Sequence, residues 1–99
     1  MATLSEILAQ DPNNVLARYG LAMEYANSGK ADRALEEFGK LLSTNPDYAA
    51  AYFMAAQTLV KANRSDEAKR MLVDGIAAAQ RKRDSHAESE MQAMLDDLS

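Results

Sequence analysis

The stretch DPNNVLARYGLAMEYANSGKADRALEEF, residues 11–38, is followed by NPDYAAAYFMAAQTLVKANRSDEAKRML, residues 45–72. The two stretches align when Pro12 is placed on Pro46, which lies 34 positions later. In that register Ala17 matches Ala51, Tyr19 matches Phe53, Asp32 matches Asp66, Ala34 matches Ala68 and Phe38 matches Leu72. Small and apolar residues that recur at a fixed spacing indicate a chain built from repeated structural units.

Each unit has the pattern of two amphipathic helices joined by a tight turn. Helix-forming residues are abundant and the alternation typical of strands is missing, so we expect helices over about 15–26, 31–44, 47–61, 65–82 and 85–98. A further short helix is expected within the first eleven residues, where Leu4, Ile7 and Leu8 match Phe38, Leu41 and Leu42 after a shift of 34. Gly29 and Asn63 occupy matching positions and suit the left-handed turn that ends a helix.

Charged residues on the 31–44 segment are predicted to face solvent. Arg33 with Glu37, and Glu36 with Lys40, are opposite charges four residues apart, a spacing that stabilises an exposed helix face.

Short connections of two to five residues predict that consecutive helices are antiparallel neighbours. The expected fold class is therefore all-α, with residues 1–99 forming a single domain. We divide it into an N-terminal cap over 1–11, a first repeat over 12–45, a second repeat over 46–79, and a helix extension with a capping helix over 80–99.

The 34-residue period resembles that of the tetratricopeptide repeat family, whose pattern is W-x2-L-G-x2-Y, then A-x3-F, then P. The matching positions are Arg18, Leu21, Ala22, Tyr25, Ala34, Phe38 and Pro46 in the first unit, and Tyr52, Ala55, Ala56, Leu59, Ala68, Leu72 and Gln80 in the second. The resemblance covers about residues 3–98 and implies a short right-handed α-solenoid of antiparallel helix pairs. Arg18, where an aromatic residue is usual, indicates a solvated edge, and Gln80, where proline is usual, predicts a longer fourth helix at the end of the array.

The resemblance also implies that the first helix of each unit lines a concave groove. Carried over by position, the groove residues are Leu16, Tyr19, Met23, Ala26 and Asn27 from the first unit and Ala50, Phe53, Met54, Gln57, Val60 and Lys61 from the second. An apolar and aromatic groove of this kind predicts a non-catalytic adaptor that binds a protein or peptide segment, apolar or amphipathic in character. Lys, Arg and Asn that grip a terminal carboxylate in some members are replaced by Tyr19, Met23 and Met54, so chaperone-tail binding is not predicted.

Three alternatives stay open on the sequence alone. The last helix could pack into the groove and make Phe53, Met54 and Val60 ordinary core residues. The chain could form a homodimer through the groove or by exchange of its last helix. It could also be the terminal piece of a larger scaffold.

Composition and motifs argue against other classes of function. The net charge of −4 disfavours nucleic acid and anionic membranes, and no apolar run is long enough to span a bilayer. No phosphate-binding loop, nucleophile motif or metal-ligand motif is present, so we expect no enzyme activity, no cofactor and no metal. The basic run Arg81–Arg83 and the single His86 are attributed to helix ends. With no cysteine and no signal-peptide pattern, the expected location is the cytoplasm.

Overall fold

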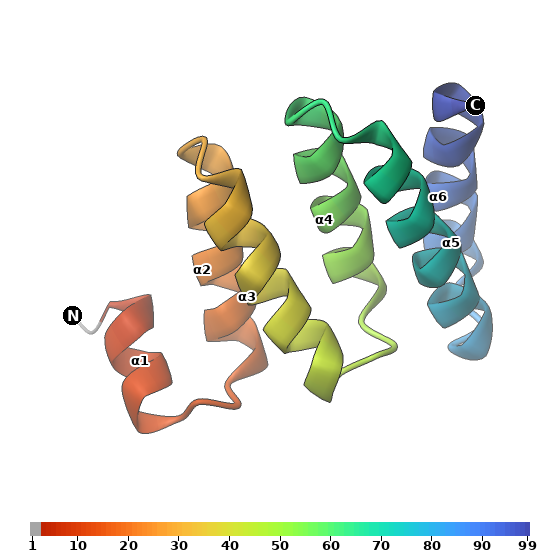
Figure 1. Cartoon of the computed structure of the whole chain (residues 1–99). Helices are drawn as coiled ribbons and strands as arrows, with labels where there is room; N and C mark the ends of the chain where they lie inside the picture. Colours follow the sequence, from red (N-terminus) through yellow and green to blue (C-terminus); the bar gives the residue numbers. More distant parts are fainter. Residues whose placement is uncertain (1–2) are drawn as a thin grey trace.

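The computed structural model describes residues 3–99; the first two residues of the predicted N-terminal cap lie outside this range. Within it the chain forms six helices and no strand: α1 (Leu4–Gln10), α2 (Val15–Asn27), α3 (Ala31–Thr44), α4 (Ala49–Lys61), α5 (Ser65–Arg81) and α6 (Ser85–Leu98). Figure 1 shows them following one another across the molecule. The all-α prediction is confirmed, and the helix boundaries expected from the repeat agree with the structure to within two residues.

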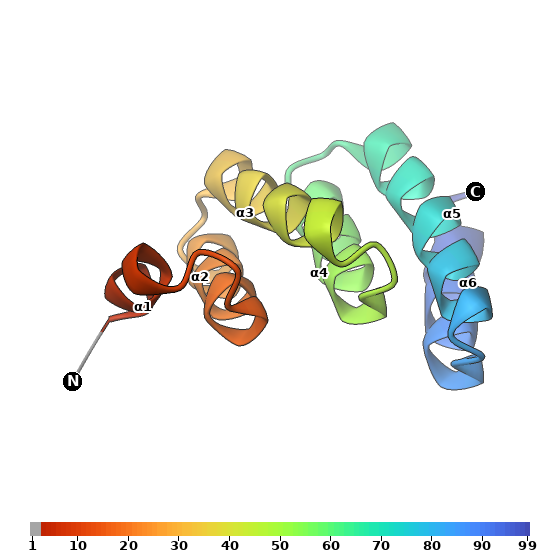
Figure 2. The same ribbon diagram turned by 90° about the horizontal axis from the view of Figure 1, so that it is seen from below.

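The helices lie in two rows. Figure 2 shows α2, α4 and α6 in one row and α3 and α5 in the other. The principal extents of the molecule are 42 × 30 × 19 Å, and the shortest of these matches two stacked helices. Each hairpin of one repeat therefore nests against the next, which makes the fold a short α-solenoid.

The reversal between the helices of a pair is made by the same turn three times. Gly29, Asn63 and Arg83 all have left-handed backbone, with φ of 74°, 60° and 56°. In the first two turns the N–H of the following residue donates to the carbonyl oxygen of Tyr25 or Leu59, each at 2.9 Å. The predicted equivalence of Gly29 and Asn63 is confirmed, whereas the conformation of Arg83 could not be anticipated from its residue type.

Three helix boundaries differ from the prediction: α2 ends at Asn27, one residue after the predicted end, and the other two are the start of α4 and the end of α5. The helix expected over 47–61 is α4, and it begins at Ala49. The two residues before it are held outside the helix, because the Tyr48 N–H donates to Asn45 O in a turn and the Asp47 carboxylate accepts from Arg81 at 2.6 Å. Helix α5 ends at Arg81, one residue before the predicted end. It is still 17 residues long against 14 for α3, the extension expected where glutamine replaces proline.

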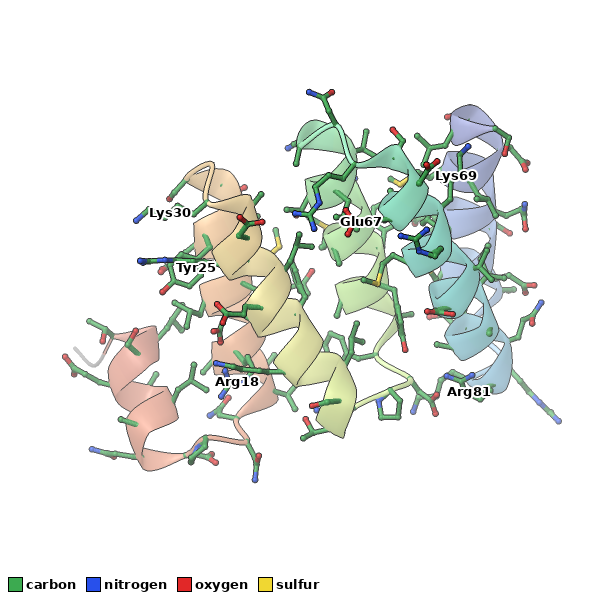
Figure 3. All side chains as sticks on the ribbon, viewed as in Figure 1. Arg18, Tyr25, Lys30, Glu67, Lys69 and Arg81 are labelled. Atoms are coloured by element: carbon green, nitrogen blue, oxygen red, sulfur yellow. The ribbon has the colours of Figure 1, made fainter. Side chains whose placement is uncertain are left out.

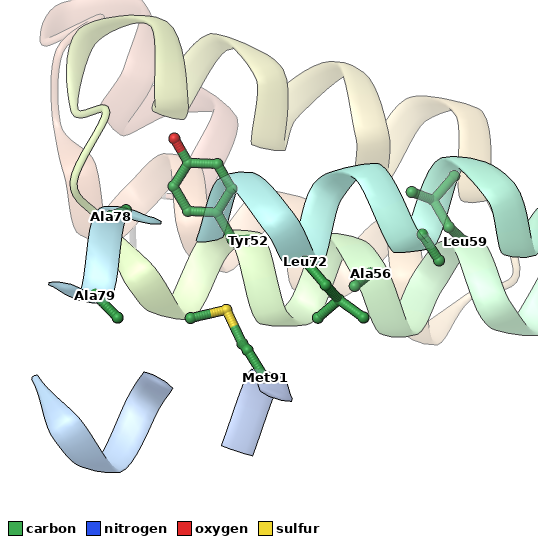
Figure 4. Packing of buried hydrophobic residues seen from close by; sticks show 8 residues of the cluster. Tyr52, Ala56, Leu59, Leu72, Ala78, Ala79 and Met91 are labelled. Atoms are coloured by element: carbon green, nitrogen blue, oxygen red, sulfur yellow. The ribbon is translucent and has the colours of Figure 1, made fainter. Parts of the chain in front are cut away.

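The core consists of two clusters of buried residues. The first contains Ala22, Ala34, Phe38, Leu41, Ala51 and Ala55, and the second contains Tyr52, Ala56, Leu59, Ala68, Leu72, Ala78, Ala79 and Met91 (Figure 4). Half-buried Leu35, Leu42 and Met71 pack against both clusters. The alanines at the family-pattern positions, Ala22 and Ala34 in the first unit and Ala56 and Ala68 in the second, are fully buried.

Helix α6 is fixed by one buried methionine and one glycine. Met91 reaches from α6 into the second cluster and is completely buried (Figure 4). A Cβ atom at Gly75 of α5 would lie only 2.5 Å from Met91 Sδ and 2.6 Å from Tyr52 Cβ. The missing side chain at Gly75 therefore lets α4, α5 and α6 meet closely.

The first repeat contains a largely buried ion pair that was not predicted from the sequence. Arg18 Nη1 lies 2.5 Å from Glu37 Oε1, and the two side chains are only 17% and 11% exposed. Figure 3 shows Arg18 at the α2–α3 side of the molecule. The predicted solvated edge at Arg18 is thus wrong, because a carboxylate on α3 faces it across the helix pair.

The predicted solvent exposure on α3 is correct for Arg33, Glu36 and Lys40 and wrong for Glu37. Glu37 turns inward toward Arg18, and Lys40 contacts Glu37 at 3.5 Å. Arg33 instead places its guanidinium 5.9 Å from the centre of the Tyr25 ring, at a distance typical of a cation–π contact.

Candidate functional site

The helices α2, α4 and α6 line one face of the molecule, and this face contains two adjoining hollows. The α6 hollow, as we name it, has a volume of about 230 Å³. Its lining residues come from α2, from α4 and from the start of α6: Tyr19, Ala49, Ala50, Phe53, Met54, Asp84, His86, Ala87, Glu90 and Met91. Its floor is apolar and aromatic, and its charged groups all come from the α6 side.

The second hollow, which we name the amide hollow, has a volume of about 220 Å³ and lies toward the C-terminal ends of α2 and α4. It is lined by Ala26, Asn27, Gly29, Ala31, Met54, Gln57, Thr58, Lys61 and Ala62. Met54 borders both hollows, so they adjoin each other along the face. Both hollows are lined mainly by apolar surface, and the amide hollow adds amide and ammonium donors.

Tyr19 belongs both to the edge of the α6 hollow and to the core. Its ring lies edge-on to Phe38, with the ring centres 6.2 Å apart, and its centre is 5.7 Å from that of Tyr48. Burial raises the pKa of the Tyr19 phenol, and the neighbouring Tyr48 adds to the rise. A side chain held on two sides in this way is a rigid contact surface.

Of the eleven groove residues predicted from the sequence, all except Ala26 and Ala50 are predicted partner contacts, and these nine are distributed unevenly over this face. Tyr19, Phe53 and Met54 border the α6 hollow, and Asn27, Met54, Gln57 and Lys61 border the amide hollow. Leu16 is 76% exposed but borders neither. Met23 packs against the first core cluster and Val60 against the second. The structure therefore brings six of the nine to the two hollows.

The last helix forms a wall of the α6 hollow. Met91 and Ala87 border it from α6, while Phe53 and Val60 are half-buried against the cluster that contains Met91. Asp84, His86 and Glu90 were not predicted from the sequence as lining residues. The apolar stripe of the last helix, which includes Ala87 and Met91, was the one signal that this helix docks there.

The polar groups of the α6 hollow have defined contacts. The Asp84 carboxylate accepts a hydrogen bond from the Ala87 N–H at 3.0 Å and so caps α6. Glu90 contacts the imidazole of His86, a side chain that is 86% exposed. These contacts leave carboxylate oxygens available at the mouth of the hollow, because each carboxylate can accept several hydrogen bonds.

Within residues 3–99 no group of three or more His, Cys, Asp or Glu side chains is arranged to hold a metal ion. None of the helices in that range has both the length and the apolar character needed to cross a membrane.

Nested antiparallel helix pairs with a fixed period define a helical-repeat protein. A family model described as tetratricopeptide repeat matches residues 25–95, and another with the same description matches residues 3–36. The TPR repeat-containing protein PA0015 of Pseudomonas aeruginosa is 30% identical over 92 residues, which cover 93% of this chain and 88% of that protein.

Solved structures agree with the sequence comparisons. The solution structure of a tetratricopeptide repeat domain protein from Salinibacter ruber superposes with a TM-score of 0.82 at 30% identity, covering 89% of each chain. That of protein BPP2914 from Bordetella parapertussis gives a TM-score of 0.83 at 32% identity, covering 96% of this chain and 83% of the other. The chain belongs to the tetratricopeptide repeat family. Members of this family are generally protein–protein interaction modules and are generally non-catalytic.

Proposed function

We propose that this protein is an adaptor that binds a protein or peptide segment along the face formed by α2, α4 and α6. The observation that carries the proposal is the pair of hollows joined at Met54, which leave apolar and aromatic side chains accessible to a partner. We place the encounter in the cytoplasm and expect the partner segment to be apolar or amphipathic.

The chemistry of the face suits such a segment. Phe53 and Tyr19 offer aromatic surface whose position is held by the core, and Met54 can adjust its shape to different side chains. The amides of Asn27 and Gln57 and the Lys61 ammonium can hydrogen-bond to the backbone of an extended chain. Binding would then combine apolar burial with a few directional contacts.

A photo-crosslinking experiment tests which face binds. The photoreactive residue benzoylphenylalanine replaces Phe53 in one variant and Val73 in a control variant. Val73 is exposed, at 56%, and lies on α5 in the opposite row. After irradiation in the cells that make the protein, we expect adducts at position 53 and few at position 73. Adducts that form equally at both positions, or only at 73, would contradict the proposal.

Self-association is a second candidate function, favoured by the apolar Leu16 side chain that α2 leaves 76% exposed. A homodimer could cover this side chain and the groove together. In that case the adduct at position 53 would have twice the mass of the chain, and light scattering would detect dimers at high concentration. A strict monomer in light scattering removes this candidate.

A further inference from the structure

The two hollows of the binding face differ in charge. The α6 hollow has two carboxylates among its lining residues, Asp84 and Glu90, and no lysine or arginine. His86, which also lines it, carries a positive charge only when protonated. The amide hollow has the opposite character, since Lys61 is the one charged side chain that lines it.

The neighbouring basic run does not supply a lining cation to the α6 hollow. Arg81 donates to the Asp47 carboxylate at 2.6 Å, and Lys82 borders a separate depression together with Asp47 and Tyr48. Arg83 is exposed and is not among the residues that line the α6 hollow. The carboxylates of Asp84 and Glu90 therefore face a partner with no lining lysine or arginine to neutralise them.

The floor between these carboxylates and Met54 is apolar. Phe53 and Met54 from α4 and Met91 from α6 border it, so a large apolar side chain of a partner would lose water there. A positive charge next to that side chain would lie at the α6 edge. Farther along the face, past Met54, Lys61 would repel a second cation.

We propose that the α6 hollow selects a peptide segment in which a large apolar side chain is adjacent to a lysine or arginine. This inference rests on the proposed function and specifies the chemistry of the partner. The apolar side chain occupies the floor, and the cation pairs with Asp84 and Glu90. An acidic segment is disfavoured at this hollow because both carboxylates would repel it.

The test is a selection from a displayed random peptide library against three forms of the full chain. These are the wild type, Ala50→Gln and Glu90→Lys. Ala50 is exposed at the edge of the hollow, so glutamine there obstructs the hollow without disturbing the core. Circular dichroism melting verifies that each variant is folded. We expect the wild type to enrich Lys or Arg next to a large apolar residue, Ala50→Gln to lose those sequences, and Glu90→Lys to shift the preference toward Asp or Glu.

Fluorescence anisotropy with one enriched peptide then measures the charge effect. We expect Glu90→Gln to weaken binding by about two- to fivefold at low salt, the range for an exposed ion pair, and the difference to shrink as salt is added. Asp97→Asn is the matched control, because it removes the same charge from an exposed residue of α6 that does not line the hollow. It should leave the affinity unchanged.

The outcomes separate this inference from the proposed function. Enriched sequences that depend on an open hollow but carry no excess of Lys or Arg would overturn the charge selection and leave groove binding in place. Equal weakening by Glu90→Gln and Asp97→Asn would also overturn it. If the wild type and Ala50→Gln enrich the same sequences, or if neither enriches any, the result counts against groove binding itself.

Discussion

The two repeats make the same hydrogen bond at one position with chemically different side chains. Arg18 in the first repeat and Tyr52 in the second lie 34 residues apart, and each donates a hydrogen bond to the carbonyl oxygen of the proline six residues earlier. The distances are 2.9 Å to Pro12 O and 2.7 Å to Pro46 O. The position therefore needs a long side chain that ends in a donor, and it does not need an aromatic ring.

The difference lies in what each side chain requires from α3 or α5. The Arg18 guanidinium brings a charge into a largely buried place and is neutralised by Glu37, whereas Tyr52 is neutral and the position equivalent to Glu37 is occupied by Met71. A buried charge without a partner is strongly unfavourable. The residues at 18 and 37 must therefore change together.

The largest expected effect comes from breaking the charged version of this pair. Glu37→Met leaves the Arg18 guanidinium without its carboxylate, and we expect the free energy of unfolding to fall by about 2–3 kcal/mol, somewhat less than for a completely buried pair. Urea denaturation measures the change.

The double variant Arg18→Tyr, Glu37→Met installs the solution of the second repeat in the first. We expect it to recover most of the stability lost in Glu37→Met, with the coupling read from a double-mutant cycle. If the double variant is no more stable than the single one, the two repeats are not interchangeable at this position.

The second largest effect is expected in the second repeat, where Gly75 packs closely against Tyr52. Alanine at this position would place its Cβ 2.6 Å from Tyr52 Cβ and 2.5 Å from Met91 Sδ, so α4 or α6 must shift. We expect Gly75→Ala to lower the free energy of unfolding by about 1–3 kcal/mol, as overpacking does.

Gly39 provides the control for that change. It also lies inside a helix, but a Cβ there would meet nothing within 4 Å. Gly39→Ala should therefore raise stability by up to about 1 kcal/mol, because alanine is the better helix former. A loss of stability in both variants would show that the cost at Gly75 is not a matter of contact with Tyr52 and Met91.

A smaller effect is expected from Tyr52→Phe, which removes only the hydrogen bond to Pro46 O. We expect a loss of about 1 kcal/mol or less, because Arg81 Nη2 lies 3.3 Å from the same oxygen and continues to donate to it. Tyr48→Phe is the control, since the Tyr48 hydroxyl makes no hydrogen bond within the described part of the chain. If Tyr52→Phe and Tyr48→Phe shift the melting temperature equally, the hydroxyl of Tyr52 has no stabilising role of its own.

The smallest effect is a dependence on alkaline pH. Burial raises the pKa of Tyr52 above its ordinary value of 10.0, Arg81 opposes the rise, and Asp74 and Asp47 add to it. The unfolded chain then releases the phenol proton at lower pH than the folded chain, so the free energy of unfolding should fall as pH rises above 10. In urea titrations from neutral to alkaline pH, Tyr52→Phe should lessen this fall without abolishing it, because the pKa of Tyr19 is also raised by burial. An unchanged slope would contradict the assignment to Tyr52.

Much of the fold could be predicted because the repeat fixes where helices start and stop. Pro12 and Pro46 set the register, and Gly29 and Asn63 mark the turns by their tolerance of positive φ. The inward turn of Glu37 was missed because its spacing to Arg33 also fits an exposed pair. The register held a signal for it: Glu37 matches the apolar Met71 and Arg18 matches Tyr52, so both charges occupy positions that are apolar or aromatic in the other repeat.

The candidate site was less predictable because its walls come from helices whose relative placement is not a local property. Position matching indicated Phe53, Met54, Gln57 and Lys61 through their place on the first helix of a repeat. Asp84 and Glu90 lie outside the two repeats and border the α6 hollow only because Met91 docks against Gly75 and Tyr52. The apolar stripe of the last helix indicates that this helix docks, but its spacing does not say which polar side chains then border the hollow.

The three side chains that touch both core clusters, Leu35, Leu42 and Met71, also bear on how the molecule could be divided. Separating the two hairpins would expose side chains that each core cluster needs for its burial, so neither hairpin is a self-sufficient fragment. Stability is thus a property of the interface between the hairpins as much as of either one, and loosening one of them would loosen its neighbour.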